Sequence, residues 1–307
     1  MRNEKQHIPV YNLERFKHVH RETTTSVFGY NNLDKSKYIP GFELYSSDGL
    51  ISSVGPLKSD FYRLSFTLRG TLEMKIGLES YKHQPGTISL TSPNQLFAKD
   101  NISADAFGYY ILFSSQFLNN LIPAIKMAEE FPFFDFYATP LFLLNEAERQ
   151  NITGLIFNID QELHHDHTGR VKAVEMYLYL ILLEAKRSYE RQELNTSADP
   201  NENAALLSNF RRLVSRHYVG KHKVSEYAEL LRISANHLNR VVKTTTGKTA
   251  SDTIREMLVL EAKSMLKYTT KSIGEISHSL DFSDPTTFNR FFRRSTGITP
   301  LEFRQKA

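Results

Sequence analysis

The stretch that decides the fold is residues 273–297, which read IGEISHSLDFSDPTTFNRFFRRSTG. Its first part has apolar residues at helical spacing, and Ser272 stands three positions before Glu275, the pattern of a capping box. A second helix is expected to begin at Asp284 and Pro285, because Asp is a favoured N-cap and Pro is preferred at the first helical position. The stretch therefore predicts two short helices joined by a turn.

The second of these helices has an apolar side and a polar side. Phe288, Phe291 and Phe292 are expected to face inward. The polar residues left for solvent or DNA include Thr286, Thr287, Asn289, Arg290 and Arg293. Asn can pair in a bidentate way with adenine, and Arg can pair with guanine or with phosphate, which is the chemistry that a major-groove reader needs.

The same layout occurs earlier in the chain, in residues 224–246. Ala228 is small enough to let two helices cross closely, the turn falls at Arg232 and Ile233, and Ser234 is expected to begin the second helix. The free face of this helix carries Asn236, Asn239, Arg240 and Lys243. These four are the candidate DNA-binding residues of the first unit.

A longer helix is predicted between the two units, over residues 251–268. At about 1.5 Å per residue it is roughly 25 Å long, so it could present two recognition helices to major-groove segments about 34 Å apart. Ser225 and Ser251 are expected to act as N-caps, and Gly247 and Gly297 as left-handed C-terminal residues. One helix-turn-helix pattern alone is a weak signal, because helical hairpins are common.

The charge of the chain strengthens this prediction. The net charge of +4 divides unevenly, since residues 1–200 carry 20 basic and 24 acidic side chains, and residues 201–307 carry 18 and 10. A basic C-terminal part with two such units indicates double-stranded DNA as a partner. A nonspecific architectural DNA-binding protein would share this asymmetry and stays an alternative.

Residues from about 210 to 304, roughly a third of the chain, resemble the DNA-binding domain of the AraC/XylS family of transcriptional regulators. The matching elements are Ile233-Ser234-Ala235-Asn236-His237-Leu238-Asn239-Arg240 with Lys243 and Gly247, the stretch Ile273 to Leu280, and Phe282-Ser283-Asp284-Pro285 with Phe288, Phe292, Gly297, Thr299-Pro300 and Phe303-Arg304.

That resemblance implies a monomeric seven-helix unit that binds promoter DNA through both recognition helices and meets RNA polymerase there. The chain departs from the family pattern at two positions, with Ser277 where the family usually has Ala and Asp281 where it usually has Gly. Because Asp tolerates left-handed backbone better than most residues, we expect a strained but intact turn. Base reading by the second unit is therefore less secure than by the first.

The N-terminal part predicts a β domain followed by helices. Short strands separated by turn residues extend from about residue 27 to 113, and long helices are expected over 146–164 and 170–192. Residues 193–203 are interpreted as a linker. The expected fold is thus α+β and multidomain, with a β-barrel and flanking helices in 1–192 and an all-α tandem helix-turn-helix domain in 204–307.

Residues 70–94 resemble the small cupin-like β-barrel that many AraC-type regulators carry, which implies a sensor or scaffold for an unidentified small-molecule effector. A metal-dependent cupin enzyme is the alternative, but such sites need two or three His with a carboxylate. Only His83 lies between His20 and His164, so no catalytic residue, metal or cofactor is expected. Aromatic strand residues that could line a pocket are Phe61, Tyr62, Phe66, Tyr81, Phe97, Tyr109 and Tyr110.

The helix over 170–192 has two interpretations. Its seam of apolar residues fits packing within its own domain, and its apolar middle also fits a homodimer interface, which the resemblance favours. The chain has no Cys, no apolar run long enough to span a membrane and no readable secretory signal at its start. We therefore expect a cytoplasmic protein with no membrane contact.

Overall fold

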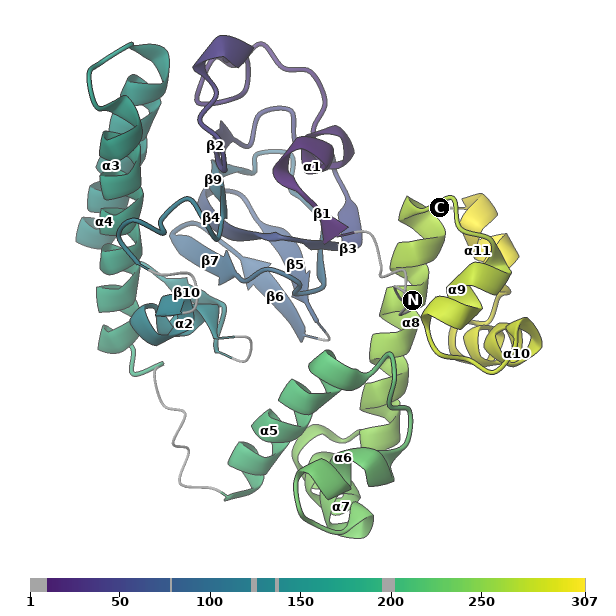
Figure 1. The fold of residues 1–307 in the computed structure, drawn as a ribbon. Coiled ribbons are helices and arrows are strands. Elements are labelled where there is room, and N and C mark those ends of the chain that lie inside the picture. The colour runs from purple at the N-terminus through teal and green to yellow at the C-terminus, as the bar shows by residue number, and fades with distance from the viewer. Residues whose placement is uncertain (1–9, 78, 123–125, 136–137, 195–201, 307) are drawn as a thin grey trace.

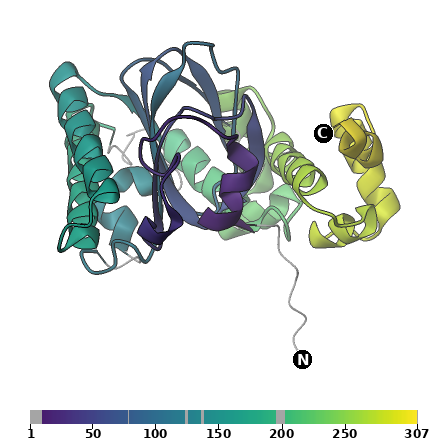
Figure 2. The same cartoon turned by 90° about the horizontal axis from the view of Figure 1, so that it is seen from above.

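The computed structural model describes residues 10–77, 79–122, 126–135, 138–194 and 202–306, and their arrangement is drawn in Figures 1 and 2. Strands and a helical pair form the N-terminal domain, and helices alone form the C-terminal domain. This confirms the expected α+β class with strands first and an all-α part last. The predicted linker includes residues 195–201, which lie outside the described residues, and helix α5 begins at Glu202.

The N-terminal strands form two five-stranded sheets, with strand orders β1-β3-β8-β5-β6 and β10-β7-β4-β9-β2. The β1–β3 pair is parallel, and the other pairs are antiparallel. The strands are β1 Val10–Tyr11, β2 Phe42–Ser46, β3 Val54–Ser59, β4 Phe61–Arg69, β5 Leu72–Ile76, β6 Glu79–His83, β7 Thr87–Thr91, β8 Phe97–Asp100, β9 Phe107–Ser114 and β10 Leu141–Leu143.

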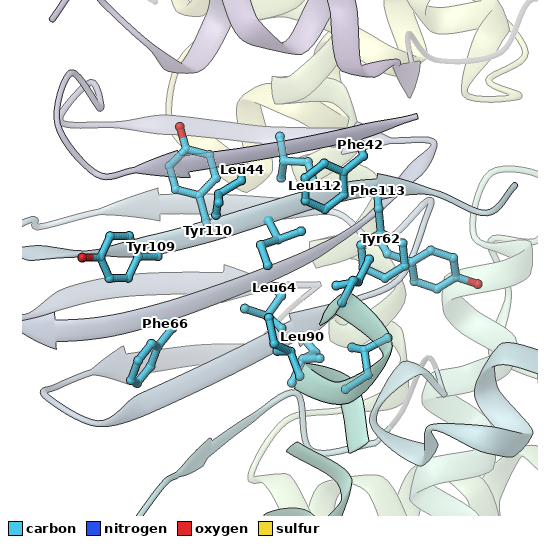
Figure 3. Packing of buried hydrophobic residues seen from close by; sticks show 14 of the residues in the cluster. Phe42, Leu44, Tyr62, Leu64, Phe66, Leu90, Tyr109, Tyr110, Leu112 and Phe113 are labelled. Atoms are coloured by element: carbon cyan, nitrogen blue, oxygen red, sulfur yellow. The ribbon is translucent and has the colours of Figure 1, made fainter. Parts of the chain in front are cut away.

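The core of this domain lies on β2, β4, β7 and β9, whose buried side chains are shown in Figure 3. Leu64 of β4 pairs in register with Leu90 of β7 and with Ile111 of β9, and all three are fully buried. Short helices border the sheets: α1 Leu13–His20, η1 Lys35–Lys37, α2 Met127–Glu130 and η3 Pro132–Phe134.

Helices α3, Glu146–His164, and α4, Arg170–Arg191, form a hairpin beside the sheets (Figure 1). The predicted bounds of α3 are confirmed, and α4 ends one residue earlier than expected. Four of the five residues of the predicted seam on α4 face the domain core, because Val174, Leu178, Leu182 and Ala185 are fully buried. The fifth, Val171, stands in the first turn of the helix and is exposed. Met176 and Leu180, one turn apart, lie on a different face of α4 that stays open to solvent.

The C-terminal helices are α5 Glu202–His217, α6 Val224–Leu230, α7 Ala235–Thr246, α8 Ala250–Tyr268, α9 Ile273–Ser279, α10 Pro285–Thr296 and α11 Pro300–Lys306. The predicted caps Ser234, Ser272 and Asp284 are confirmed, since each side chain accepts a backbone N–H of the first helical turn. Gly247 and Gly297 have the expected left-handed conformation after α7 and α10.

Two predicted N-caps are wrong. Helix α6 begins two residues before the expectation from Ser225, because the carboxylate of Glu226 accepts the backbone N–H of Lys223 at 2.8 Å. Helix α8 is capped by Thr249 instead of Ser251: the Thr249 hydroxyl oxygen accepts the N–H of Asp252 at 3.1 Å, and the Asp252 carboxylate accepts the N–H of Thr249 at 3.0 Å. These reciprocal bonds complete a capping box, which Ser251 does not offer.

The two domains contact each other along helix α8 and strand β3. Glu261 of α8 is fully buried, and its carboxylate lies 3.2 Å from the Lys58 ammonium of β3. The Tyr218 hydroxyl accepts from Lys58 at 2.7 Å and donates to Glu261. At the other end of the contact, the Tyr268 hydroxyl accepts the N–H of Gly55 at 2.7 Å. The helix between the two helix-turn-helix units is therefore fixed to the β domain.

Candidate nucleic-acid interface

The first helix-turn-helix unit consists of α6 and α7. After α6 the chain turns at Arg232, which has a φ of 56°, and the N–H of Ile233 donates to the carbonyl of Ala228 at 3.0 Å. A hydrogen bond of this kind closes the C-terminus of a helix that is followed by one left-handed residue, here Arg232. Ala228 is buried at the crossing of the helices, as expected, and α7 packs through Leu238 and its apolar neighbours.

The outer face of α7 carries all four candidates, and Asn236, Asn239, Arg240 and Lys243 are each exposed. The Arg240 Nη2 donates to His237 Nδ1 at 2.9 Å, which orients the guanidinium along the helix. Among them, Asn239 has a structural contact as well, because its Oδ1 accepts the N–H of Ala250 at 2.9 Å. That bond ties α7 to the first turn of α8.

The second unit, α9 and α10, repeats this geometry. Asp281 is left-handed with a φ of 59°, and the N–H of Phe282 donates to the carbonyl of Ser277 at 3.1 Å. The turn is therefore intact despite the departure from Gly. Ser277 occupies the position of Ala228 and is fully buried, but its hydroxyl has no hydrogen-bond partner in the described structure.

On α10, Thr286, Arg290 and Arg293 are exposed, and the Asn289 Nδ2 donates to the Pro285 carbonyl at 2.9 Å. Asn289 occupies the position of Asn239, but the residue equivalent to Ala250 is Pro300, which has no N–H to donate.

Thr287 is turned toward the helix start instead. Its hydroxyl donates to the Asp284 carboxylate at 2.8 Å, and its N–H donates to the same carboxylate at 2.8 Å. These hydrogen bonds to the charged form lower the pKa of Asp284 to about 2.

Helix α8 sets the spacing of the two units. It has 19 residues, so it is about 28 Å long. Helices α7 and α10 both contact it, and they lie toward its opposite ends (Figure 1). Equivalent positions of α7 and α10 carry cations, with Arg240 matched by Arg290 and Lys243 by Arg293. Two basic helix faces are thus held on one rigid helix.

Residues 227–306 match the helix-turn-helix domain family, over the same two units. The C-terminal domain is an AraC-type helix-turn-helix domain. The family match agrees with the resemblance that the sequence carries between residues 210 and 304. The AraC-type domain therefore comprises the tandem units and the helix α8 between them.

Matches that extend beyond the AraC-type domain have low sequence identity. The Msm operon regulatory protein of Streptococcus mutans is 21% identical over 281 residues, which are 90% of this chain and 96% of that protein. The HTH-type transcriptional activator RhaS of Enterobacter sp. is 22% identical over 188 residues, 61% of this chain and 63% of RhaS, so that match spans less than two thirds of RhaS. Unsaturated fatty acid bound ToxT from Vibrio cholerae aligns with a TM-score of 0.41 at 14% identity, covering 87% of this chain and 95% of ToxT.

The β domain that precedes the AraC-type domain contains a cavity between its two sheets. Of the aromatic residues proposed from the sequence, Phe66, Phe97, Tyr109 and Tyr110 line it. Phe61 and Tyr62 pack in the core, and Tyr81 lines a different pocket, at the contact with the AraC-type domain. Sequence reasoning missed Arg63 and Lys99, which also line the cavity. Each stands two positions after a buried Phe of its strand, Phe61 before Arg63 and Phe97 before Lys99, and this alternation places it on the same face as that Phe.

The described histidines of the β domain lie in separate places, apart from His165 and His167, whose rings stack. His83 is fully buried, its Nδ1 is 3.0 Å from the Thr67 hydroxyl, and burial lowers its pKa to about 4. His164 and His165 each contact a carbonyl of their own helix. In the described part of the chain, no group of three or more His, Asp or Glu side chains could hold a metal ion. No described helix is long and apolar enough to cross a membrane.

Proposed function

We propose that this protein is a sequence-specific, DNA-binding transcription regulator. In this proposal α7 and α10 enter successive major-groove segments of double-stranded promoter DNA. The observation that supports this proposal most directly is the duplication of the unit. Two turns of the same geometry lead into two helices with cations at equivalent positions, and one rigid helix of about 28 Å joins the two units. Adjacent major-groove segments on one side of B-DNA lie about 34 Å apart, so the two helices can reach both.

The contacts of each candidate suggest a division of roles. Arg240 and Arg290 are exposed and can form bidentate pairs with guanine. Lys243 and Arg293 lie one turn further along and are assigned to phosphates. Asn236 and Thr286 stand at the helix N-termini, where residues of recognition helices meet base edges. Asn239, Asn289 and Thr287 already have partners in the protein, and we assign them to positioning the helices, with their remaining polar atoms free for DNA.

Further parts of the proposal concern the partners. The relatives are named as a regulatory protein and a transcriptional activator, which supports a regulator and not an enzyme. By family resemblance the DNA-bound protein meets RNA polymerase. The exposed Met176 and Leu180, which share one face of α4, support a homodimer. We place the protein in the cytoplasm, with the β domain as a sensor of a small-molecule effector.

Selection of bound sequences from random DNA tests specificity. We expect one enriched sequence, which random competitor DNA at physiological salt does not displace, and we expect Arg240→Ala to lose about 1 to 3 kcal/mol at one base position of it. Lys172→Ala on α4 is the matched control, because Lys172 is exposed on the helical pair at the far side of the β domain. Equal competition by random DNA would identify a nonspecific architectural protein instead.

A further inference from the structure

The cavity in the β domain has a volume of about 310 Å³ and lies between the two sheets. Its walls are mostly apolar, with Phe16 of α1, Phe66 of β4, Met74 of β5 and Phe97 of β8 among them. Ligand pockets in proteins typically have volumes of about 300 to 1,000 Å³ and mostly apolar walls, so this cavity is large enough to hold a small molecule. Its polar groups decide which chemistry it accepts.

Two cations from opposite sheets point into this cavity. Arg63 on β4 is 4% exposed and Lys99 on β8 is 7% exposed. The Arg63 guanidinium lies over the ring of Phe97, 3.8 Å from its centroid, and one of its edges makes a 3.4 Å contact with the Thr91 hydroxyl. The Arg63 Nη2 on the other edge is buried without a hydrogen-bond partner, and Lys99 has no ion pair or hydrogen bond within the described chain.

No carboxylate balances these charges, because none of the described residues that line the cavity is Asp or Glu. The other titratable groups beside them are Arg21, His20 and Tyr110. Burial lowers the pKa of Arg63 to about 9, and burial together with Arg63 and Arg21 lowers the pKa of Lys99 to about 7. Burying two unpaired cations side by side costs the fold free energy, which a bound anion would offset.

We propose that this cavity binds a small organic monocarboxylate, whose carboxylate lies between Arg63 and Lys99 and whose compact apolar body lies among the aromatic walls. The free edge of a guanidinium presents two N–H groups that match the two carboxylate oxygens. A dianionic phosphate ester is the weaker candidate, because burying its second charge costs desolvation free energy that contacts with apolar walls do not offset. Binding is argued from the cavity alone, whereas an effector role rests on the proposed function.

The cavity has a short path to the AraC-type domain. Lys99 pairs in register with Val54 at the start of β3, and β3 carries Lys58 and Gly55, which hold α8. A carboxylate that draws the Lys99 side chain toward Arg63 acts on the strand next to the domain contact. The bound ligand is therefore placed to change how firmly β3 holds α8.

Calorimetry with matched acids and alcohols tests the site without DNA, so its outcome is independent of the proposed DNA binding. The probes are benzoate, hexanoate and 3-phenylpropionate, each compared with its alcohol, and phenyl phosphate. We expect at least one acid to bind with a Kd below about 1 mM and at least about tenfold more tightly than its alcohol, since charge-assisted hydrogen bonds are lost with the carboxylate. At pH 8 binding should also take up protons, because the carboxylate favours the charged form of Lys99.

Variants complete the test. Arg63→Gln and Lys99→Met should each weaken the acid at least about tenfold and leave the alcohol nearly unchanged, whereas Lys82→Met, at an exposed position of β6, should change neither. The proton uptake measured on the unaltered protein keeps the test valid if a variant does not fold. Equal binding of acid and alcohol, tighter binding of phenyl phosphate, or no binding of any acid would overturn the proposal.

Discussion

Replacing Lys99 by Met should make the β domain more stable in the absence of ligand. The pKa of Lys99 falls from 10.5 to about 7 on folding, because the side chain is buried beside other cations. A difference of one in pKa corresponds to about 1.4 kcal/mol, so the charged form costs the fold about 5 kcal/mol. At pH 7 about half of the folded molecules have released the proton, which reduces the net cost to about 4 kcal/mol. Met fills similar space without a charge. For a domain of this size the gain corresponds to roughly 10 °C in Tm.

The pH dependence of this gain has a defined sign. Between pH 7 and 10.5 the unfolded chain keeps the Lys99 proton while the folded chain releases it, so the wild-type free energy of unfolding rises with pH in this window. Below pH 7 both states hold the proton and the full cost applies. The advantage of Lys99→Met should therefore fall from about 4 kcal/mol at pH 7 to roughly 1 kcal/mol at pH 9.5. Glu43, whose pKa burial raises to about 7, titrates in both proteins and cancels in the comparison.

Urea denaturation followed by circular dichroism at pH 7 and pH 9.5 measures both values, with Lys82→Met as the matched control. The reasoning is refuted if Lys99→Met is no more stable than the wild type at pH 7, or if its advantage is the same at both pH values. Either result would mean that the Lys99 ammonium is well solvated in the cavity. A bound anion would then have no burial cost of Lys99 to offset.

Three further substitutions test the structural account. Ser277→Ala should stabilise the AraC-type domain by about 1 kcal/mol in thermal unfolding, because it removes a buried hydroxyl without a partner; a loss of stability would show that the hydroxyl is hydrogen-bonded. Asp281→Gly should add about 0.5 to 1 kcal/mol in the same assay, since Gly adopts a φ of 59° without strain, and an unchanged Tm would mean that Asp281 is not strained. Lys58→Met should weaken the contact between the domains by about 3 kcal/mol, because Glu261 stays buried without its cation. Hydrogen exchange in α8 should then become faster and be restored by adding Glu261→Gln; no change would show that the ion pair does not hold the domains together.

Features that depend on neighbours in the sequence could be predicted. Ser272, Asp284 and Gly297 mark helix ends because capping uses groups three or four residues apart, and the sequence displays them directly. The wrong caps had a readable cause as well, since Thr249 and Asp252 form a capping box that competes with Ser251. The left-handed turn at Asp281 followed from the family pattern and the tolerance of Asp.

Features that depend on distant segments could not be predicted. Lys58 and Glu261 lie more than two hundred residues apart, and nothing in either local pattern indicates that a buried Glu of α8 needs a cation from a strand. Arg63 and Lys99 each looked like an ordinary polar position in a strand, and only the folded sheets bring both into one cavity. Asn239 was predicted correctly to stand on α7, but its bond to Ala250 depends on how α8 crosses that helix.

The central claim is that both units of the AraC-type domain hold DNA at the same time. Hydroxyl-radical footprinting on the selected DNA sequence tests it most directly, with the wild type, Arg240→Ala and Arg290→Ala. We predict two protected segments about one helical turn apart, with Arg240→Ala weakening protection of one and Arg290→Ala weakening the other. A single protected segment, or equal weakening of both segments by each variant, would contradict the claim that α7 and α10 read separate parts of the DNA.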